Sequence, residues 1–184
     1  MKKGVFMKLK LAIAALAATL SMSSFAGFMI EPYAGFGTYA TTLDAAAFED
    51  AEASGETYTS VGARAGYSLL LFSGGLDLEM MATGDGNINN TAFWVGVDLP
   101  VLLRFYGKYI FSSSFDYDND DASSVDLEFD SGYAVGVGFT GLPFVVINLE
   151  VSALNYTFEN PLNTSQDVDF GVAATALTVS LPLP

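Results

Sequence analysis

The chain has 184 residues, no cysteine, no histidine and a formal net charge of −14. Without cysteine we expect neither a disulfide framework nor a lipid-anchored lipoprotein. The acidity also argues against a protein that binds nucleic acid through its phosphates. Apolar residues make up 51% of the chain, which is enough for a large core or a large apolar outer surface.

The first 26 residues have the composition of a secretory signal. Four lysines precede an apolar stretch at 11–20, and Ser24 and Ala26 are the small residues expected before a cleavage site. An apolar stretch of about ten residues is too short to cross a bilayer as a helix, which needs roughly 20 residues. We therefore expect export and cleavage after Ala26, with residues 27–184 as one domain. A start at Met7 would still leave a complete signal of ordinary length.

Beyond the signal, bulky apolar side chains alternate with small or polar ones. The clearest stretch is 125–139, in which Val135, Val137 and Phe139 are separated by glycines and the intervening residues at 126, 128 and 130 are acids. Successive side chains of a strand point to opposite faces, so this stretch predicts a strand with one bulky apolar face. A soluble barrel would turn that face inward. The reverse orientation, with small and polar residues inside, is typical of a narrow barrel in lipid.

The same alternation predicts an all-β fold, an eight-stranded antiparallel transmembrane barrel built as an up-and-down meander. The strands are expected at about 28–40, 58–70, 76–80, 93–99, 104–115, 125–139, 145–152 and 168–181. The last of these is the least regular and is expected to contain a bulge. In the strand at 104–115, Phe115 is predicted to face outward and Ser112 inward. Phe129 is likewise predicted to face outward and Asp130 inward.

The connections between these strands alternate in length. Four long or acidic loops are predicted at 41–57, 84–90, 116–124 and 159–167. Short turns are predicted at 73–75, around Pro100 and at 141–143. Long loops on one side and tight turns on the other are typical of outer-membrane barrels, so we expect the acidic loops to face the cell exterior.

This arrangement resembles the small eight-stranded outer-membrane β-barrels of the OmpA or OmpW type. The resemblance is architectural and covers residues 27–184. It implies a place in the outer membrane of a Gram-negative bacterium, contact with outer-membrane lipid and lipopolysaccharide, and insertion by the barrel-assembly machinery. The chain departs from these proteins at its end, where Leu-Pro-Leu-Pro stands in place of a terminal aromatic residue.

Eight charged residues fall at inward-facing positions of the predicted strands. They include all three basic residues that follow the signal. An eight-stranded barrel is just wide enough for side chains to fill it, and an isolated buried charge costs several kcal/mol, so these charges are expected to pair. Hairpin geometry places four of them near the middle and four nearer the end that holds the termini. The middle group is Arg64, Glu79, Lys108 and Glu150, and the other group is Glu31, Asp77, Asp98 and Arg104.

We expect this network to plug the lumen of the barrel. The protein itself is then expected to have a structural or surface-interaction role, and the sequence does not indicate its surface partner. A small pore or transporter for small or apolar solutes is the alternative, with the ion pairs forming a gate or a narrow cation-preferring path. We expect neither an enzyme nor a cofactor, because a chain without histidine cannot form a Ser-His pair.

The segment 116–121 places acids at three alternate positions of an apparent calcium loop. An EF-hand would also need Gly at the sixth position and Glu at the twelfth, where this chain has Asp121 and Leu127. We expect a solvated acidic loop, with weak divalent-cation binding as the alternative. The candidate ligands are Asp116, Asp118, Asp120 and Asp121.

Overall fold

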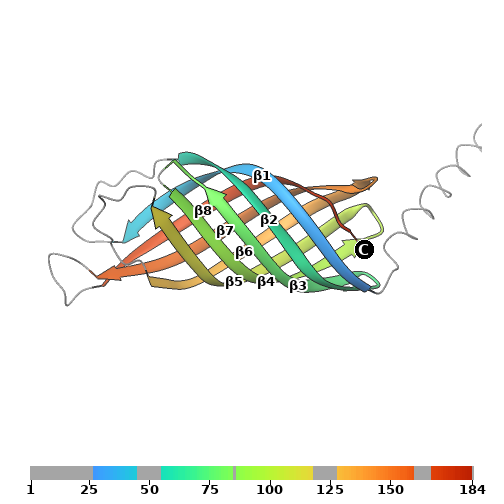
Figure 1. Cartoon of the computed structure of the whole chain (residues 1–184), viewed down its shortest axis with the longest axis horizontal. Coiled ribbons are helices and arrows are strands. Elements are labelled where there is room, and N and C mark those ends of the chain that lie inside the picture. Colours follow the sequence, from blue (N-terminus) through green and yellow to red (C-terminus); the bar gives the residue numbers. More distant parts are fainter. Residues whose placement is uncertain (1–26, 45–54, 85, 118–127, 160–166, 184) are drawn as a thin grey trace, which may run out of the picture.

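The structure is a computed structural model that describes residues 27–44, 55–84, 86–117, 128–159 and 167–183. Each strand pairs antiparallel with the next, and β1 pairs with β8 to close a barrel (Figure 1). The predicted eight-stranded antiparallel meander is therefore confirmed. No helix in the described part of the chain is long and apolar enough to cross a membrane. The strands are β1 Gly27–Asp44, β2 Gly55–Leu69, β3 Phe72–Ala82, β4 Gly86–Leu99, β5 Leu103–Tyr117, β6 Glu128–Leu142, β7 Val145–Glu159 and β8 Asp167–Ser180.

The two ends of the barrel differ in their connections. At the end that also holds the described C-terminus, tight turns at 70–71, 100–102 and 143–144 join the strands (Figure 1). We call this the turn end and the opposite end the loop end. The short turn predicted at 73–75 is wrong in position, because those residues pair within β3 and the chain already reverses at Leu70 and Leu71.

At the loop end one predicted long loop is a tight connection. The backbone amide of Thr83 donates to the carbonyl of Gly86, 2.8 Å away, and β4 begins at Gly86. The loop predicted at 84–90 is therefore wrong, because most of it pairs with β3 and β5. The other three predicted loops lie partly in strands, and their remaining parts, 45–54, 118–124 and 160–166, are outside the described residues.

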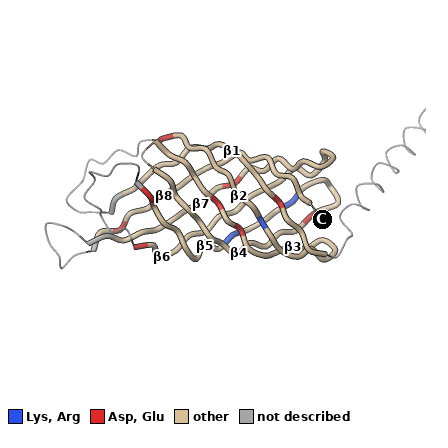
Figure 2. Tube along the Cα trace, in the orientation of Figure 1, with Lys and Arg blue, Asp and Glu red and all other residues tan. Residues whose placement is uncertain are grey.

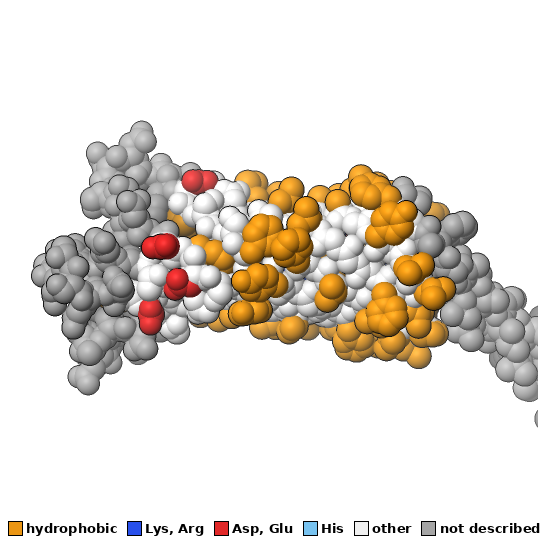
Figure 3. Space-filling view, turned by 90° about the horizontal axis from the view of Figure 1, so that it is seen from below, with side chains coloured by type: hydrophobic (Ala, Val, Ile, Leu, Met, Phe, Trp, Pro, Cys, Tyr) orange, Lys and Arg blue, Asp and Glu red, His pale blue; other side chains and the backbone are white. Residues whose placement is uncertain are grey.

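Most strand residues face as the alternation predicts. On β3, for example, Leu76, Leu78 and Met80 are exposed while Asp77 is buried. On the face shown in Figure 3, apolar side chains lie from the middle of the barrel to the turn end, and acidic side chains gather at the loop end. The three basic residues of the described chain lie between the middle of the barrel and its turn end (Figure 2).

Two bulges reverse the predicted facing near the loop end. Phe111 is an extra residue on β5 opposite β4, so Ser112 is exposed and Phe115 packs against the apolar interior. Asp130 is an extra residue on β6 opposite β7, so it is exposed whereas Phe129 packs inward. An extra residue shifts the two-residue period by one, so every residue beyond it changes face. The bulge expected in the last strand is wrong, since β8 pairs regularly on both sides.

The interior is divided into two zones along the barrel axis. The half toward the turn end holds the charged residues. The half toward the loop end is filled by an apolar cluster, which the alternation did not predict because it placed small and polar residues inside. Its buried members are Tyr58, Met81, Ile88, Ala92, Ile110, Leu154, Tyr156, Val172, Ala174 and Ala176.

Candidate functional site: the charged lumen

Arg64 is at the centre of the charged zone. Its Nε lies 2.9 Å from Asp77 Oδ2, and its Nη1 lies 3.4 Å from Glu31 Oε1. These two contacts follow from the register, because Glu31, Arg64 and Asp77 are directly opposite one another on β1, β2 and β3. The third contact crosses the lumen, where Nη2 lies 3.4 Å from Oε2 of Glu150 on β7. One guanidinium therefore binds carboxylates from three strands.

Lys108 makes a second centre next to the first. Its Nζ lies 2.9 Å from Glu150 Oε1, 3.2 Å from Asp77 Oδ2 and 3.9 Å from Glu79 Oε2. Asp77 and Glu150 are thus each shared between Lys108 and Arg64. Because Lys108 is on β5, these contacts add another strand to the network.

Arg104 extends the network toward the turn end. Its Nη1 lies 2.6 Å from Glu31 Oε2, and its Nε lies 2.8 Å from Asp98 Oδ1. The structure therefore brings all eight charged residues named from the sequence into one connected set of ion pairs. Their predicted division into two depths is wrong in one respect, because Glu31 and Asp77 both bind Arg64 and join the two groups.

Five carboxylates face only three cations in this set, and hydroxyl groups supply further donors. Tyr33 Oη donates to Asp77 Oδ1 over 2.7 Å, and Tyr106 Oη donates to Glu150 Oε2 over 2.8 Å. Removing ions from water is costly unless their remaining hydrogen-bonding positions are filled, so these hydroxyls offset part of the cost of burying the two carboxylates.

Both tyrosines lie across a glycine of the neighbouring strand. Tyr33 is opposite Gly62 in the register, and Tyr106 is opposite Gly136. In each pair the tyrosine ring occupies the space that a β-carbon on the glycine would need. The glycines therefore let each ring lie flat along the inner wall and reach a carboxylate one strand further on, Asp77 or Glu150. The alternation placed these glycines inside but gave no sign of their tyrosine partners.

The two rings also hold the arginine between them. The Cζ atom of Arg64 lies 4.4 Å from the centroid of the Tyr106 ring and 4.9 Å from that of Tyr33. A guanidinium within about 6 Å of an aromatic face is attracted by the ring quadrupole. Arg64 is thus held both by ion pairs to three carboxylates and by the faces of two aromatic rings.

A polar ladder extends the network across the closing seam of the barrel. Asn148 Nδ2 on β7 donates to Ser180 Oγ on β8 over 3.1 Å, and that hydroxyl donates to Glu31 Oε1 on β1 over 2.6 Å. Strands β7, β8 and β1 are therefore linked inside the lumen as well as through their backbones. Neither the link of Asn148 nor that of Ser180 was predicted from the sequence.

The inward acids of the network are all engaged in ion pairs. Each acid that would serve in acid–base catalysis is paired with a cation, and the chain has no histidine. Among the described residues, no group of three or more acids is placed to hold a metal ion. Of the candidate calcium ligands, Asp116 accepts a hydrogen bond from Asn89 Nδ2 over 2.8 Å. Asp118, Asp120 and Asp121 lie outside the described residues.

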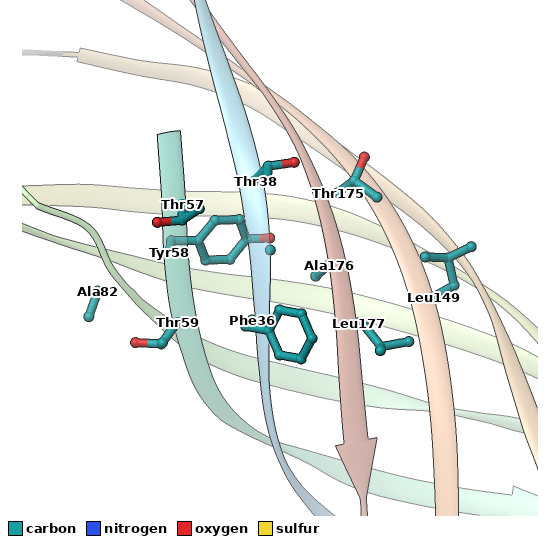
Figure 4. A pocket seen from close by; sticks show the side chains of 11 residues that line it. Phe36, Thr38, Thr57, Tyr58, Thr59, Ala82, Leu149, Thr175, Ala176 and Leu177 are labelled. Atoms are coloured by element: carbon teal, nitrogen blue, oxygen red, sulfur yellow. The ribbon is translucent and has the colours of Figure 1, made fainter. Parts of the chain in front are cut away.

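The outer wall carries a separate groove of about 640 Å³ over β1, β2 and β8. Threonines from all three strands line it together with Phe36 and Leu177 (Figure 4). Its floor includes Tyr58 and Ala176, which also belong to the apolar cluster inside. At this level the groove and the apolar interior are separated by a single layer of residues.

Comparison with solved structures identifies the fold. No protein-family model matches the sequence, and a search of the curated proteins found no match. The crystal structure of Neisserial surface protein A superposes with a TM-score of 0.52 at 12% identity, covering 86% of this chain and 99% of that one. This chain folds as a small eight-stranded outer-membrane β-barrel.

Two further outer-membrane proteins are similar to this barrel at lower scores. OprG from Pseudomonas aeruginosa has a TM-score of 0.38 at 11% identity, covering 88% of this chain and 98% of its own. Ail of Yersinia pestis has a TM-score of 0.33 at 11% identity, covering 84% and 98%.

Proposed function

We propose that this barrel spans the outer membrane of a Gram-negative bacterium after cleavage at Ala26, with its loop end facing outward. Three features support this placement: the fold, the apolar outer wall, and the burial of every basic residue of the described strands inside the lumen. Large exposed apolar surfaces mark contact with lipid or protein. The exposed acids at the loop end fit an aqueous surface (Figure 3) and are Glu56, Asp116, Glu128, Asp130 and Asp169.

Its role in this proposal is structural: a closed barrel that presents acidic loops at the cell surface to a partner not yet identified. The observation that carries it is the position of Arg64, which is fully buried in the lumen and paired with carboxylates from three strands. Opening a path there would separate these ion pairs at a cost of several kcal/mol. The proposal includes no catalysis and no cofactor. Its other partners are outer-membrane lipid, lipopolysaccharide and the barrel-assembly machinery, with no binding to nucleic acid.

Planar-bilayer conductance tests the closed lumen. Residues 27–184 would be refolded in detergent, checked for strand content by circular dichroism, and added to a bilayer. We expect little or no steady current. Large and reproducible single-channel steps would overturn the closed barrel and favour a pore.

One observation favours a second role, the passage of small apolar solutes. The wall groove and the inner apolar cluster share Tyr58 and Ala176, so a path from one to the other would be short and would bypass the ion pairs. Uptake of N-phenyl-1-naphthylamine by intact cells tests this role, since ion conductance does not report it. Cells carrying the barrel are expected to take up no more probe than cells without it, and cells treated with a chelator serve as the permeable control. Faster uptake would favour the second role.

A further inference from the structure

The tight turns at the turn end are unusually apolar. Leu70, Val101 and Phe144 are at the tips of the three turns, and 67%, 66% and 75% of their surfaces are exposed. Water-facing turns are normally built from Gly, Asn, Asp, Ser and Pro. Here each hairpin instead presents a large apolar side chain at its outermost point.

The backbone conformation of the turns is also unusual for large apolar residues. Leu70, Leu102 and Phe144 have φ angles of 58°, 65° and 68°. This left-handed region favours Gly or Asn and is strained for a bulky side chain. In water, Leu70 and Phe144 would combine a strained backbone with an exposed apolar group. In an apolar surrounding, burial of the side chain would offset the strain.

The length of the outer apolar surface indicates what that surrounding is. Outward apolar residues run on β2 and its turn from Val61 to Leu70, and on β3 from Met80 to Phe72. At about 3.3 Å per residue and a tilt of about 40°, these rows cover roughly 20–23 Å of the barrel axis. The apolar band of an outer-membrane barrel is about 25 Å tall. These rows come close to that height only if they lie in the membrane as far as the turn end, so no length is left for a water-exposed segment between the apolar wall and the turns.

The apolar rim also continues past the turns to the end of the described chain. Leu183 exchanges backbone hydrogen bonds with Ile30, with N···O distances of 2.8 and 3.1 Å. Leu181, Leu183 and Phe28 are all exposed beside this pairing. The rim therefore runs over three hairpins and both terminal strands, whereas a docked protein would cover one side of it.

We infer that the turn end is immersed in the inner leaflet of the membrane, with Leu70, Val101 and Phe144 in contact with phospholipid acyl chains. This inference rests on the proposed membrane placement and is continuous with the apolar wall above the turns. The barrel then sits low in the bilayer, and the polar ends of its strands project on the loop side.

Single spin labels test this depth, because a chain without cysteine allows each label to be placed at one site. Leu70→Cys, Val101→Cys and Phe144→Cys would be labelled in phosphatidylcholine vesicles. Val95→Cys on the exposed outer face of β4 and Gly84→Cys at the loop end are the matched controls. Power saturation then measures how often each label collides with oxygen, which is enriched in lipid, and with Ni-EDDA, which stays in water. Freeze–thaw cycles place Ni-EDDA on both sides of the vesicle membrane. Val101 has no left-handed backbone, so its variant keeps the test informative if the other two fold poorly.

We expect the turn labels to lose Ni-EDDA collisions and gain oxygen collisions, as at Val95 and unlike at Gly84. Turn labels that resemble Gly84 while Val95 resembles lipid would overturn the inference and leave the membrane placement intact. Water accessibility at Val95 as well would overturn the placement itself. The turn labels could also be shielded from Ni-EDDA only at a high ratio of protein to lipid. Shielding that disappears on dilution in lipid would mean that a second copy of the chain covers the rim, and it would also overturn the inference.

Discussion

Arg64 on β2 and Glu150 on β7 meet across the lumen, with Nη2 3.4 Å from Oε2. Their strands are not neighbours in the barrel, so no backbone hydrogen bond joins them. The pair therefore connects walls that the sheet itself leaves apart. Since Glu150 also binds Lys108, the link continues to β5.

Replacing Arg64 with Ala should lower the free energy of unfolding by about 3–5 kcal/mol. The change leaves Glu31, Asp77 and Glu150 without one of their cations, and breaking a buried pair by removing one partner costs about this much. Urea unfolding in detergent micelles would measure it, with the fluorescence of the single tryptophan, Trp94, as the probe. Asp169→Asn, on the exposed loop end, is the control and should leave the midpoint unchanged. An unaltered midpoint for Arg64→Ala would show that the inner network contributes little.

Tyr106→Phe should destabilise the barrel by about 1.5–3 kcal/mol, the range for a hydrogen bond to a charged group. The variant keeps the ring over Arg64 and removes only the hydroxyl that donates to Glu150 Oε2. Tyr109→Phe on the same strand is the matched control, because Tyr109 is outward-facing and exposed. The same unfolding measurement applies. Equal midpoints for the two variants would mean that the Tyr106 hydroxyl bond adds no stability.

The period-two alternation was sufficient to place the network. Arg64 and Asp77 each stand between outward apolar residues, so the face of each was predictable, and pairing followed from the cost of burying charge. Their exact partners depend on register. The link from Arg64 to Glu150 crosses the lumen between strands that do not pair, and no local pattern in the sequence carries that information.

The two bulges and the division of the interior into two zones could not be predicted from the alternation, and the reason is physical. A bulge adds one residue without a marker in the sequence, so Phe115 and Phe129 keep the outward position that strict alternation gives them until the pairing is known. Both side chains in fact face inward and pack in an apolar interior. The alternation had indicated a polar lumen instead. The early start of β4 at Gly86 was missed because Gly and Asn residues are typical of loops as well as of inward strand positions.

Leu154→Ala should cost about 2–5 kcal/mol of stability, the usual range for a buried leucine. Leu154 belongs to the apolar cluster and is 1% exposed, so no lipid or detergent can fill the cavity without entering the barrel. Leu149→Ala is the matched control on β7, where the side chain is 48% exposed and faces outward. Urea midpoints for the pair give the difference. A larger loss at Leu149 would indicate that the loop half of the lumen is not a packed core.

Gly136→Ala should destabilise the barrel by about 1–3 kcal/mol, the usual cost of overpacking. The new methyl group would overlap the ring of Tyr106, which is held by Glu150 and Arg64 and has little freedom to move. Gly107→Ala is the control on the neighbouring strand, since its β-carbon would come no closer than 3.8 Å to the backbone oxygen of Ala134.

The double variant Gly136→Ala with Tyr106→Phe separates strain from loss of the hydrogen bond. If the methyl group already pushes the Tyr106 hydroxyl away from Glu150, removing that hydroxyl adds little further loss. The double variant should then lose less stability than the two single changes combined, as expected for residues that share a partner. Strict additivity would instead show that the ring adjusts to the methyl group and keeps its bond to Glu150.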